Sequence, residues 1–266
     1  LFRSVRFKNE KGDIRLGSRL VDGRVVEVVE TPDNGFLETG RDCKVRQVLA
    51  PVLPAAVFCI GLNYRAHATE TGMPLPVYPV VFMKNPAAVI GTGETIVVPA
   101  CCKERPEVDY EVELAVVIGK AAKDVSETGA IAHVKGYTVG NDVSARRWQK
   151  HAGAGQWVRG KSFDTFCPLG PVLVTPDEIP DPDDLGLSCV LNGETMQESR
   201  TSDMIFTVSQ LIAYLSQDTT LLPDTVILTG TPSGVGFTRN PPVYLKPGDT
   251  VEMNVEKIGT LANAVV

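Results

Sequence analysis

Three carboxylates recur at every second position in one short segment of the sequence. Asp109, Glu111 and Glu113 alternate with apolar or aromatic residues at the start of "VDYEVELAVVIG", which then becomes wholly apolar. Such alternation predicts a β-strand, in which residues two apart point to the same face at a spacing of about 7 Å. In an interior strand, an unpaired carboxylate costs several kcal/mol or takes up a proton. A divalent cation would remove that cost, and carboxylate oxygens favour Mg²⁺, Mn²⁺ or Ca²⁺ over zinc.

The same alternation also fits an edge strand whose polar face lies in water. A second segment, "GNDVSAR", places Asp142 beside a glycine at the end of a predicted strand. There Asp142 could supply a further ligand, although the segment taken alone is an ordinary turn. The carboxylate pattern therefore indicates a cation site and leaves the solvated strand as the alternative.

A histidine and a glutamate stand three residues apart in "NYRAHATE". On a short helix ending at Gly72, His67 and Glu70 would share one face. A carboxylate beside an imidazole fixes its tautomer and raises its basicity, as general acid–base catalysis requires. The alternative is a surface ion pair. The glycine-rich "LTGTPSGVG" has no phosphate-loop spacing, but its backbone N–H groups could hold a carboxylate.

Composition limits the class of protein. The chain has 266 residues, 43% of them hydrophobic, which is enough to bury a sizeable core. Its formal net charge is −6, without a basic cluster, which argues against nucleic acid or an anionic membrane surface as a partner. No apolar run approaches the roughly 20 residues that cross a bilayer. A small molecule is the expected partner.

Cysteine and histidine usage indicates an intracellular protein, either cytoplasmic or mitochondrial. The six cysteines include no CxxC pair, and a chain of this length needs no disulfides, so we expect reduced thiols. The spacings of a zinc site are missing. Of the three histidines, His133 and His151 are expected to be structural or at the surface.

The order of predicted elements favours a strand-rich mixed α+β fold. Strands outnumber helices and do not alternate with them regularly. Residues 1–54 show short strands and turns, including a hairpin signal at Asp22-Gly23, and predict a small N-terminal β-rich subdomain. Residues 55–266 are expected to form the catalytic domain.

Three further elements stand out in the second part of the chain. Apolar spacing in "TVSQLIAYLSQ" predicts a helix over residues 207–217. Another helix is expected near residues 126–134, and "GDTVEMNVEKIGTLANAVV" predicts a closing hairpin over 248–266.

Taken together, the segments resemble the fumarylacetoacetate hydrolase family, most closely its eukaryotic domain-containing-protein-2 branch. The motifs that carry the resemblance occur in order from about residue 57 to the C-terminus: "GLNYRAHATE", "EVDYEVELAVVIGK", "GYTVGNDVSAR", "GKSFDTFCPLGP", "LNGETMQ", "MIF" and "ILTGTPSGVG". The resemblance implies a β-roll or sandwich like that family's C-terminal domain, a homodimer, and bound Mg²⁺ or Mn²⁺.

The resemblance also implies roles for individual residues. The metal ligands would be Glu111, Glu113 and Asp142, with Asp109 beside them. The catalytic residues would be His67, Glu70 and Lys161. The substrate-binding residues would be Arg146, Gln149 and Thr231. One position departs from the family pattern, since relatives usually read "SARDW" where this chain reads "SARRW" with Arg147. Arg147 puts the local salt bridges and the substrate preference in question, but not the metal site.

Substrates implied by the resemblance are 2-oxo acids with a second carbonyl or carboxylate nearby. Hydrolysis of a C–C bond in an acylpyruvate-type diketo acid is the first expectation, with keto–enol tautomerisation or decarboxylation of oxaloacetate as the alternative. All three reactions pass through one enolate. A non-catalytic metal-binding scaffold is a further alternative, which the presence of His67, Glu70 and Lys161 disfavours.

Overall fold

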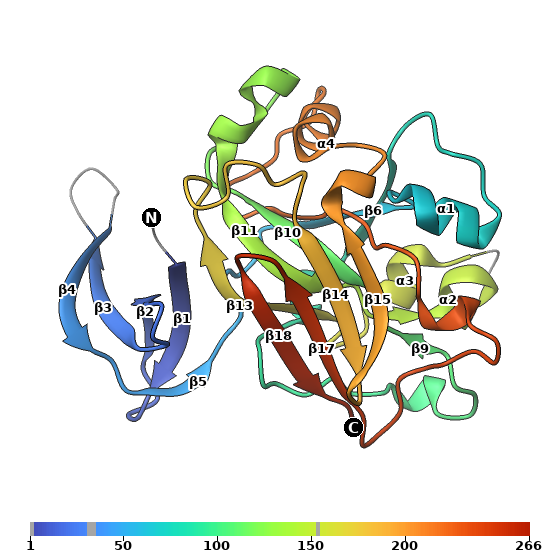
Figure 1. The fold of residues 1–266 in the computed structure, drawn as a ribbon, viewed down its shortest axis with the longest axis horizontal. Helices are drawn as coiled ribbons and strands as arrows, with labels where there is room; N and C mark the ends of the chain where they lie inside the picture. Colours follow the sequence, from blue (N-terminus) through green and yellow to red (C-terminus); the bar gives the residue numbers. More distant parts are fainter. Residues whose placement is uncertain (1–2, 31–35, 153–154) are drawn as a thin grey trace.

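The expected strand-rich mixed α+β class is confirmed. The computed structural model describes residues 3–30, 36–152 and 155–266, and Figure 1 shows a strand-rich body with short helices at one side. In these ranges a large sheet follows the order β4-β3-β2-β1-β13-β11-β10-β16-β6-β7, with β5 paired to β1 and β8 to β13. Its strands are β1 (Arg3–Asn9), β2 (Ile14–Arg19), β3 (Val25–Glu30), β4 (Phe36–Asp42), β5 (Val45–Val48), β6 (Val57–Gly61), β7 (Val80–Lys84), β8 (Val89–Ile90), β10 (Val112–Ile118), β11 (Val134–Asn141), β13 (Cys167–Val174) and β16 (Val226–Leu228).

A second sheet, in the order β15-β14-β17-β18, packs in front of the central strands of the large sheet (Figure 1). Alternate residues of β14 and β17 are buried against β10 and β11, as in a sandwich. The expected closing hairpin is confirmed as β17 paired with β18. The strands of this sheet are β14 (Gly186–Leu191), β15 (Glu194–Arg200), β17 (Thr250–Val255) and β18 (Gly259–Ala264).

The helices are short and differ in how well the sequence predicts them. Helix α1 ends at Gly72, whose φ of 67° is the left-handed cap expected there. Helix α4 begins with a capping box between Thr207 and Gln210, within the range predicted. The helix expected near 126–134 is a 3₁₀ helix. The α-helices are α1 (Arg65–Thr71), α2 (Arg146–Lys150), α3 (Trp157–Lys161) and α4 (Val208–Leu215), and the 3₁₀ helices are η1 (Pro86–Ala88), η2 (Ala100–Cys102), η3 (Glu127–His133), η5 (Thr201–Asp203) and η6 (Gly236–Thr238).

The N-terminal strands continue the large sheet. The Asp22-Gly23 turn joins β2 to β3 as an antiparallel pair, as the sequence predicts. Strand β1 then pairs with β13 through Arg3 and Ser4, so the β1–β4 strands at one side of Figure 1 are hydrogen-bonded to the body. The division into residues 1–54 and 55–266 stays a prediction.

Strand β10 is the element that positions the predicted site. All seven of its residues are buried, and it pairs antiparallel with β11 and β16. In this register Val112 faces Asn141 and Glu113 faces Gly140. The start of β10 therefore lies beside the end of β11, which brings Asp142 next to the carboxylates of the 108–119 segment.

One strand prediction is wrong in part, because residues 108–119 do not form a continuous strand. Val108 and Asp109 form β9, which pairs with β12 (Ser144–Ala145), and β10 begins only at Val112. Between them, the Tyr110 N–H donates to Asp109 Oδ1 and the Glu111 N–H donates to Asn141 Oδ1, in place of ladder carbonyls. These side-chain acceptors take the backbone out of the ladder, so Asp109 does not continue the line of Glu111 and Glu113.

Two further observations concern the chain as a whole. All six cysteines are free. Among the described residues, no helix is both long enough and apolar enough to cross a membrane.

Candidate active site

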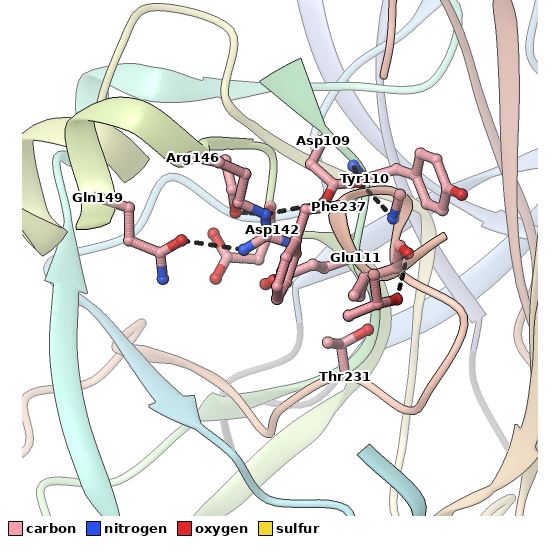
Figure 2. Close-up of polar contacts among 12 residues, drawn as sticks. Asp109, Tyr110, Glu111, Asp142, Arg146, Gln149, Thr231 and Phe237 are labelled. Atoms are coloured by element: carbon pink, nitrogen blue, oxygen red, sulfur yellow. Dashed lines mark hydrogen bonds and ion pairs between the residues drawn. The ribbon is translucent and has the colours of Figure 1, made fainter. Parts of the chain in front are cut away.

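Three buried carboxylates gather where β10 meets the end of β11. One oxygen each from Glu111, Glu113 and Asp142 lies within 4.8 Å of the others. The Asp142 N–H donates to the Glu111 carbonyl at 3.0 Å, which fixes the two residues relative to each other. Figure 2 shows Glu111 and Asp142 close together with Arg146. The edge-strand alternative is thereby excluded for Glu111 and Glu113, because both are buried.

Buried cations hold two of these carboxylates. The Lys161 ammonium lies 2.7 Å from Glu111 Oε2 and 2.6 Å from Asp142 Oδ2. Lys84 contacts Asp142 Oδ1 at 2.5 Å from the other side, and Arg146 Nη2 lies 2.7 Å from Glu111 Oε1. Although burial raises the pKa of Glu111, Lys161 and Arg146 outweigh it and hold that pKa well below its usual range.

Glu113 is in a different environment. In the described part of the chain it has no salt bridge to a lysine or arginine, and one oxygen accepts the Gly230 N–H at 2.7 Å. Burial, together with the charges of Asp142 and Glu111, raises the pKa of Glu113 well above its usual value. An additional positive charge beside Glu113 would reverse that shift.

The balance of charge fits a divalent cation. If every group were ionised, the buried groups at this end of the site would carry four negative and three positive formal charges: Asp109, Glu111, Glu113 and Asp142 against Lys84, Arg146 and Lys161. One negative charge is left over, and it is concentrated near Glu113. A divalent cation held by all-oxygen ligands would turn this excess into a net positive charge suited to an anionic substrate.

Asp109 supports the site without belonging to the cluster. Its Oδ2 accepts from Arg146 Nε at 2.8 Å, and its two oxygens accept the N–H groups of Gly236 and Phe237 at 2.8 and 3.0 Å. Figure 2 shows these contacts joining Asp109 to Arg146 and Phe237. The glycine-rich loop predicted to hold a carboxylate thus holds Asp109 through Gly236, and Asp109 in turn orients Arg146.

Helix α1 brings the imidazole and its carboxylate together. His67 Nδ1 lies 2.8 Å from Glu70 Oε2, and the other Glu70 oxygen accepts the Gly234 N–H and the Thr238 hydroxyl, each at 2.9 Å. Burial raises the pKa of Glu70, but these hydrogen bonds outweigh it and lower the pKa overall. With Nδ1 engaged, Nε2 is the ring nitrogen left to exchange a proton with a ligand.

The remaining predicted residues lie near the cluster. Gln149 Oε1 accepts from Arg146 Nη1 at 3.0 Å (Figure 2). The Thr231 hydroxyl donates to the Val112 carbonyl and accepts from Gln197 Nε2, at 3.0 and 2.9 Å. Thr231 is therefore tied to the start of β10.

A cavity of about 510 Å³ brings these groups together. The members of the predicted set that line it are His67, Glu70, Glu111, Glu113, Arg146, Gln149, Lys161 and Thr231. Apolar and aromatic residues also line it, including Phe82 and Trp157 with their ring centroids 5.3 Å apart. His133 and His151 do not line it. The cavity thus combines carboxylates of the cluster, the His67–Glu70 pair and fixed cations.

Arg147 forms its own salt bridge in place of the family's acid. Its Nη2 lies 3.0 Å from Glu107 Oε1 and 2.9 Å from the Cys101 carbonyl, while its N–H donates to Glu107 Oε2. The contacts fix the start of α2 from outside the cavity, so the departure leaves the carboxylate cluster in place.

Lys84 is a site residue that the sequence reasoning misses. Its side chain is fully buried, and its ammonium also donates to the Val143 carbonyl at 3.1 Å. The available signal was a lysine ending the otherwise apolar strand "VVFMK". A buried lysine requires a carboxylate partner, which could have been sought among the predicted ligands.

The fold and the site agree with comparisons to known proteins. Residues 56–266 match the family described as fumarylacetoacetate (FAA) hydrolase, C-terminal. The chain belongs to this fumarylacetoacetate hydrolase family, and it is a metal-dependent enzyme. Among its relatives, a bovine protein named "Oxaloacetate tautomerase FAHD2A, mitochondrial" is 51% identical over 219 residues, covering 82% of this chain and 69% of the relative. The branch expected from the motifs is thereby confirmed.

Solved structures share this architecture over most or all of the chain. A 2-hydroxyhepta-2,4-diene-1,7-dioate isomerase from Mycobacterium marinum superposes with a TM-score of 0.85 at 40% identity, covering 100% of this chain and 98% of its own. A fumarylpyruvate hydrolase from Pseudomonas aeruginosa, solved with Mn²⁺ and pyruvate, has a TM-score of 0.72 at 30% identity, covering 83% and 92%.

Proposed function

We propose that this protein is an oxaloacetate keto–enol tautomerase that uses Mg²⁺ or Mn²⁺. The observation that carries the proposal is that the His67–Glu70 pair lines the same cavity as Glu111 and Glu113, two members of the carboxylate cluster. The name of the bovine relative supports oxaloacetate as the substrate. Acylpyruvate hydrolysis is the first expectation from the sequence, and the comparisons favour its alternative.

Each group of residues at the cavity would have its own role in tautomerisation. Glu111, Glu113 and Asp142 would hold the cation, which when bound supplies Lewis acidity toward the 2-oxo acid. His67 Nε2 would move the proton at C3, while Glu70 keeps the ring oriented through Nδ1. Lys161 and Arg146 supply fixed positive charge for the developing enolate oxygen and the carboxylate. One proton leaves C3 and one reaches the C2 oxygen, so no water or redox partner is needed.

Hydrolysis of an acylpyruvate-type diketo acid is the second candidate. It is favoured by the likeness to fumarylpyruvate hydrolase, and it would use the same enolate. The difference lies in His67, which would then activate water for attack on the distal carbonyl. Loss of CO₂ from oxaloacetate needs neither removal of a C3 proton nor that water, and the enolate that remains takes up a proton at C3 to give pyruvate.

A three-reaction assay tests the proposal. With the Mg²⁺-loaded protein we expect saturable conversion of enol-oxaloacetate to the keto form. The loss of enol absorbance measures this conversion. Acylpyruvate cleavage and pyruvate formation from oxaloacetate, measured in the same buffer, should be slower by at least about tenfold in kcat/KM, equivalent to about 1.4 kcal/mol. Faster acylpyruvate cleavage would replace the proposal with the second candidate.

The location in the cell is also inferred from the bovine relative. Of the two predicted locations, mitochondria are supported by the name of the bovine relative. Fractionation of the source cells should place the protein with a mitochondrial marker, and recovery with the cytoplasmic marker would contradict this.

A further inference from the structure

A second cation on helix α2 lines the cavity and was not part of the predicted site. Lys150 follows Arg146 by four residues, so both project from one side of the helix. Both lie over the ring of Phe237, with Arg146 Cζ 4.5 Å and Lys150 Nζ 3.4 Å from its centroid. Two cations therefore share one aromatic ring at the wall of the cavity.

Lys150 differs from the other cations of the site in lacking a carboxylate. Arg146 and Lys161 each bridge to buried acids, whereas none of the salt bridges within the described residues involves Lys150. The cavity carboxylates Glu70 and Glu111 already have other partners. The partial burial of Lys150 and the charge of Arg146 lower its pKa, so an added anion would be favourable there.

The ring that holds Lys150 is itself held in place. Phe237 donates its N–H to Asp109, and the preceding Gly236 is packed so closely that a Cβ would lie 1.8 Å from the Val243 carbonyl oxygen. An ammonium on a fixed ring keeps its position with less loss of rotamer freedom. Despite its partial burial, Lys150 stays exposed to solvent, so it marks the outer part of the cavity, whereas the carboxylate cluster is buried.

We propose that Lys150 is a specificity-determining residue that selects 2-oxo acids carrying a second carboxylate. The buried end of the cavity would take the 2-oxo acid group, and the Lys150 ammonium would pair with the carboxylate at the far end of the substrate. The inference rests on the proposed function. It assigns a binding partner to the end of the substrate that contacts neither the carboxylate cluster nor the His67–Glu70 pair.

The test compares two ligands that differ in the second charge and in one methyl group. 3,3-Difluoro-oxaloacetate cannot enolise, and its 4-methyl ester lacks the second negative charge. Titration calorimetry with the Mg²⁺-loaded protein should show the dianion binding about tenfold more tightly than the ester, near the lower end for a charged hydrogen bond because Lys150 is exposed. Lys150→Met removes the charge but keeps most of the apolar side chain beside Phe237, and it should reduce the ratio to about twofold or less.

Controls separate charge from packing and binding from turnover. Lys150→Arg should keep the preference for the dianion, and ester affinity should stay within about twofold in all three proteins. Equal affinities in the wild type, an undiminished preference in Lys150→Met, or a lost preference in Lys150→Arg would overturn the inference. Because neither ligand can be tautomerised, a preference that depends on Lys150 would support it even if oxaloacetate is not tautomerised, an outcome that would defeat the proposed function alone.

Discussion

At the scale of single residues, the carboxylates of the cluster are held by unequal partners. Asp142 contacts two lysines, Glu111 contacts a lysine and an arginine, and Glu113 accepts a backbone N–H. Removing one partner of a buried pair is costly because the charge left behind has no water. Substitution of the residues that contact the three carboxylates therefore tests the site while the proposed metal ligands stay intact.

We predict that Lys84→Met destabilises the metal-free protein by about 3 kcal/mol, since the buried Asp142 loses its contact at Oδ1. Mg²⁺ would supply the missing positive charge, so the rise in Tm on adding Mg²⁺ should be larger in the variant than in the wild type. Lys135→Met, which removes a half-exposed pair with Asp224, should change the free energy of unfolding by less than about 1 kcal/mol. Equal effects of the two substitutions would contradict this account of Lys84.

We predict that His67→Ala lowers the rate of tautomerisation by roughly 10²- to 10⁴-fold, the usual contribution of a general acid–base. Mg²⁺ affinity should be nearly unchanged, because the imidazole contacts Glu70 and not the carboxylate cluster. Glu70→Gln should cost less, since Glu70 orients the ring. His133→Ala, outside the cavity, is the matched control. Unchanged turnover in His67→Ala would show that the pair is structural.

At the scale of elements, strand pairing explains why the site forms from distant segments. Alternation predicts that Glu111 and Glu113 point one way, and the antiparallel register of β10 with β11 adds Asp142. Periodicity could not reveal the break at Tyr110, because it depends on the Asn141 side chain replacing a ladder carbonyl. The break separates Asp109 from the cluster and directs it to Arg146.

The loop after β16 gives a prediction at this scale. A Cβ at Gly236 would lie 1.8 Å from the Val243 carbonyl oxygen and 2.6 Å from Asp109 Oδ1. Gly236→Ala should destabilise the protein by about 2–3 kcal/mol, because the added Cβ overlaps these atoms. It should also lower activity, because Asp109 would move and no longer orient Arg146. Gly129→Ala, which meets only ordinary contacts of 3.4 Å and above, should stay within about 0.5 kcal/mol in denaturant unfolding. Similar stability of the two variants would show that the loop relaxes freely.

At the scale of the whole molecule, the sequence predicts the class and the C-terminal hairpin, and the ordered motifs predict the family. Less local features escape it. Lys84 and Lys150 give no periodic signal, and their meaning comes from the Asp142 carboxylate and the Phe237 ring, which are distant in sequence. The continuity of β1 with β13 is likewise a long-range pairing that no local pattern specifies.

The predicted homodimer also belongs to this scale. Strand β7 lies at one end of the large sheet, and the segment before it exposes Val77 and Tyr78, which are 81% and 69% accessible. Light scattering at micromolar concentration should give twice the chain mass of 28.6 kDa. Val77→Asp should weaken the dimer, while Val21→Asp, at a still more exposed position in a hairpin turn, should not. A monomeric wild type would contradict the prediction.

The central claim is that the cluster of Glu111, Glu113 and Asp142 makes oxaloacetate tautomerisation depend on a divalent cation. The most direct measurement is the rate of enol-absorbance decay by chelator-stripped protein during titration with Mg²⁺, corrected for the uncatalysed reaction. The catalysed rate of the wild type should be near zero without Mg²⁺ and should rise to its full value as the Mg²⁺ site saturates. Glu113 is the carboxylate of the cluster that has no salt bridge to a lysine or arginine among the described residues. The Glu113→Gln variant, if folded, should recover no activity at the same Mg²⁺ concentrations. Full activity after chelation, or wild-type recovery in Glu113→Gln, would contradict the account.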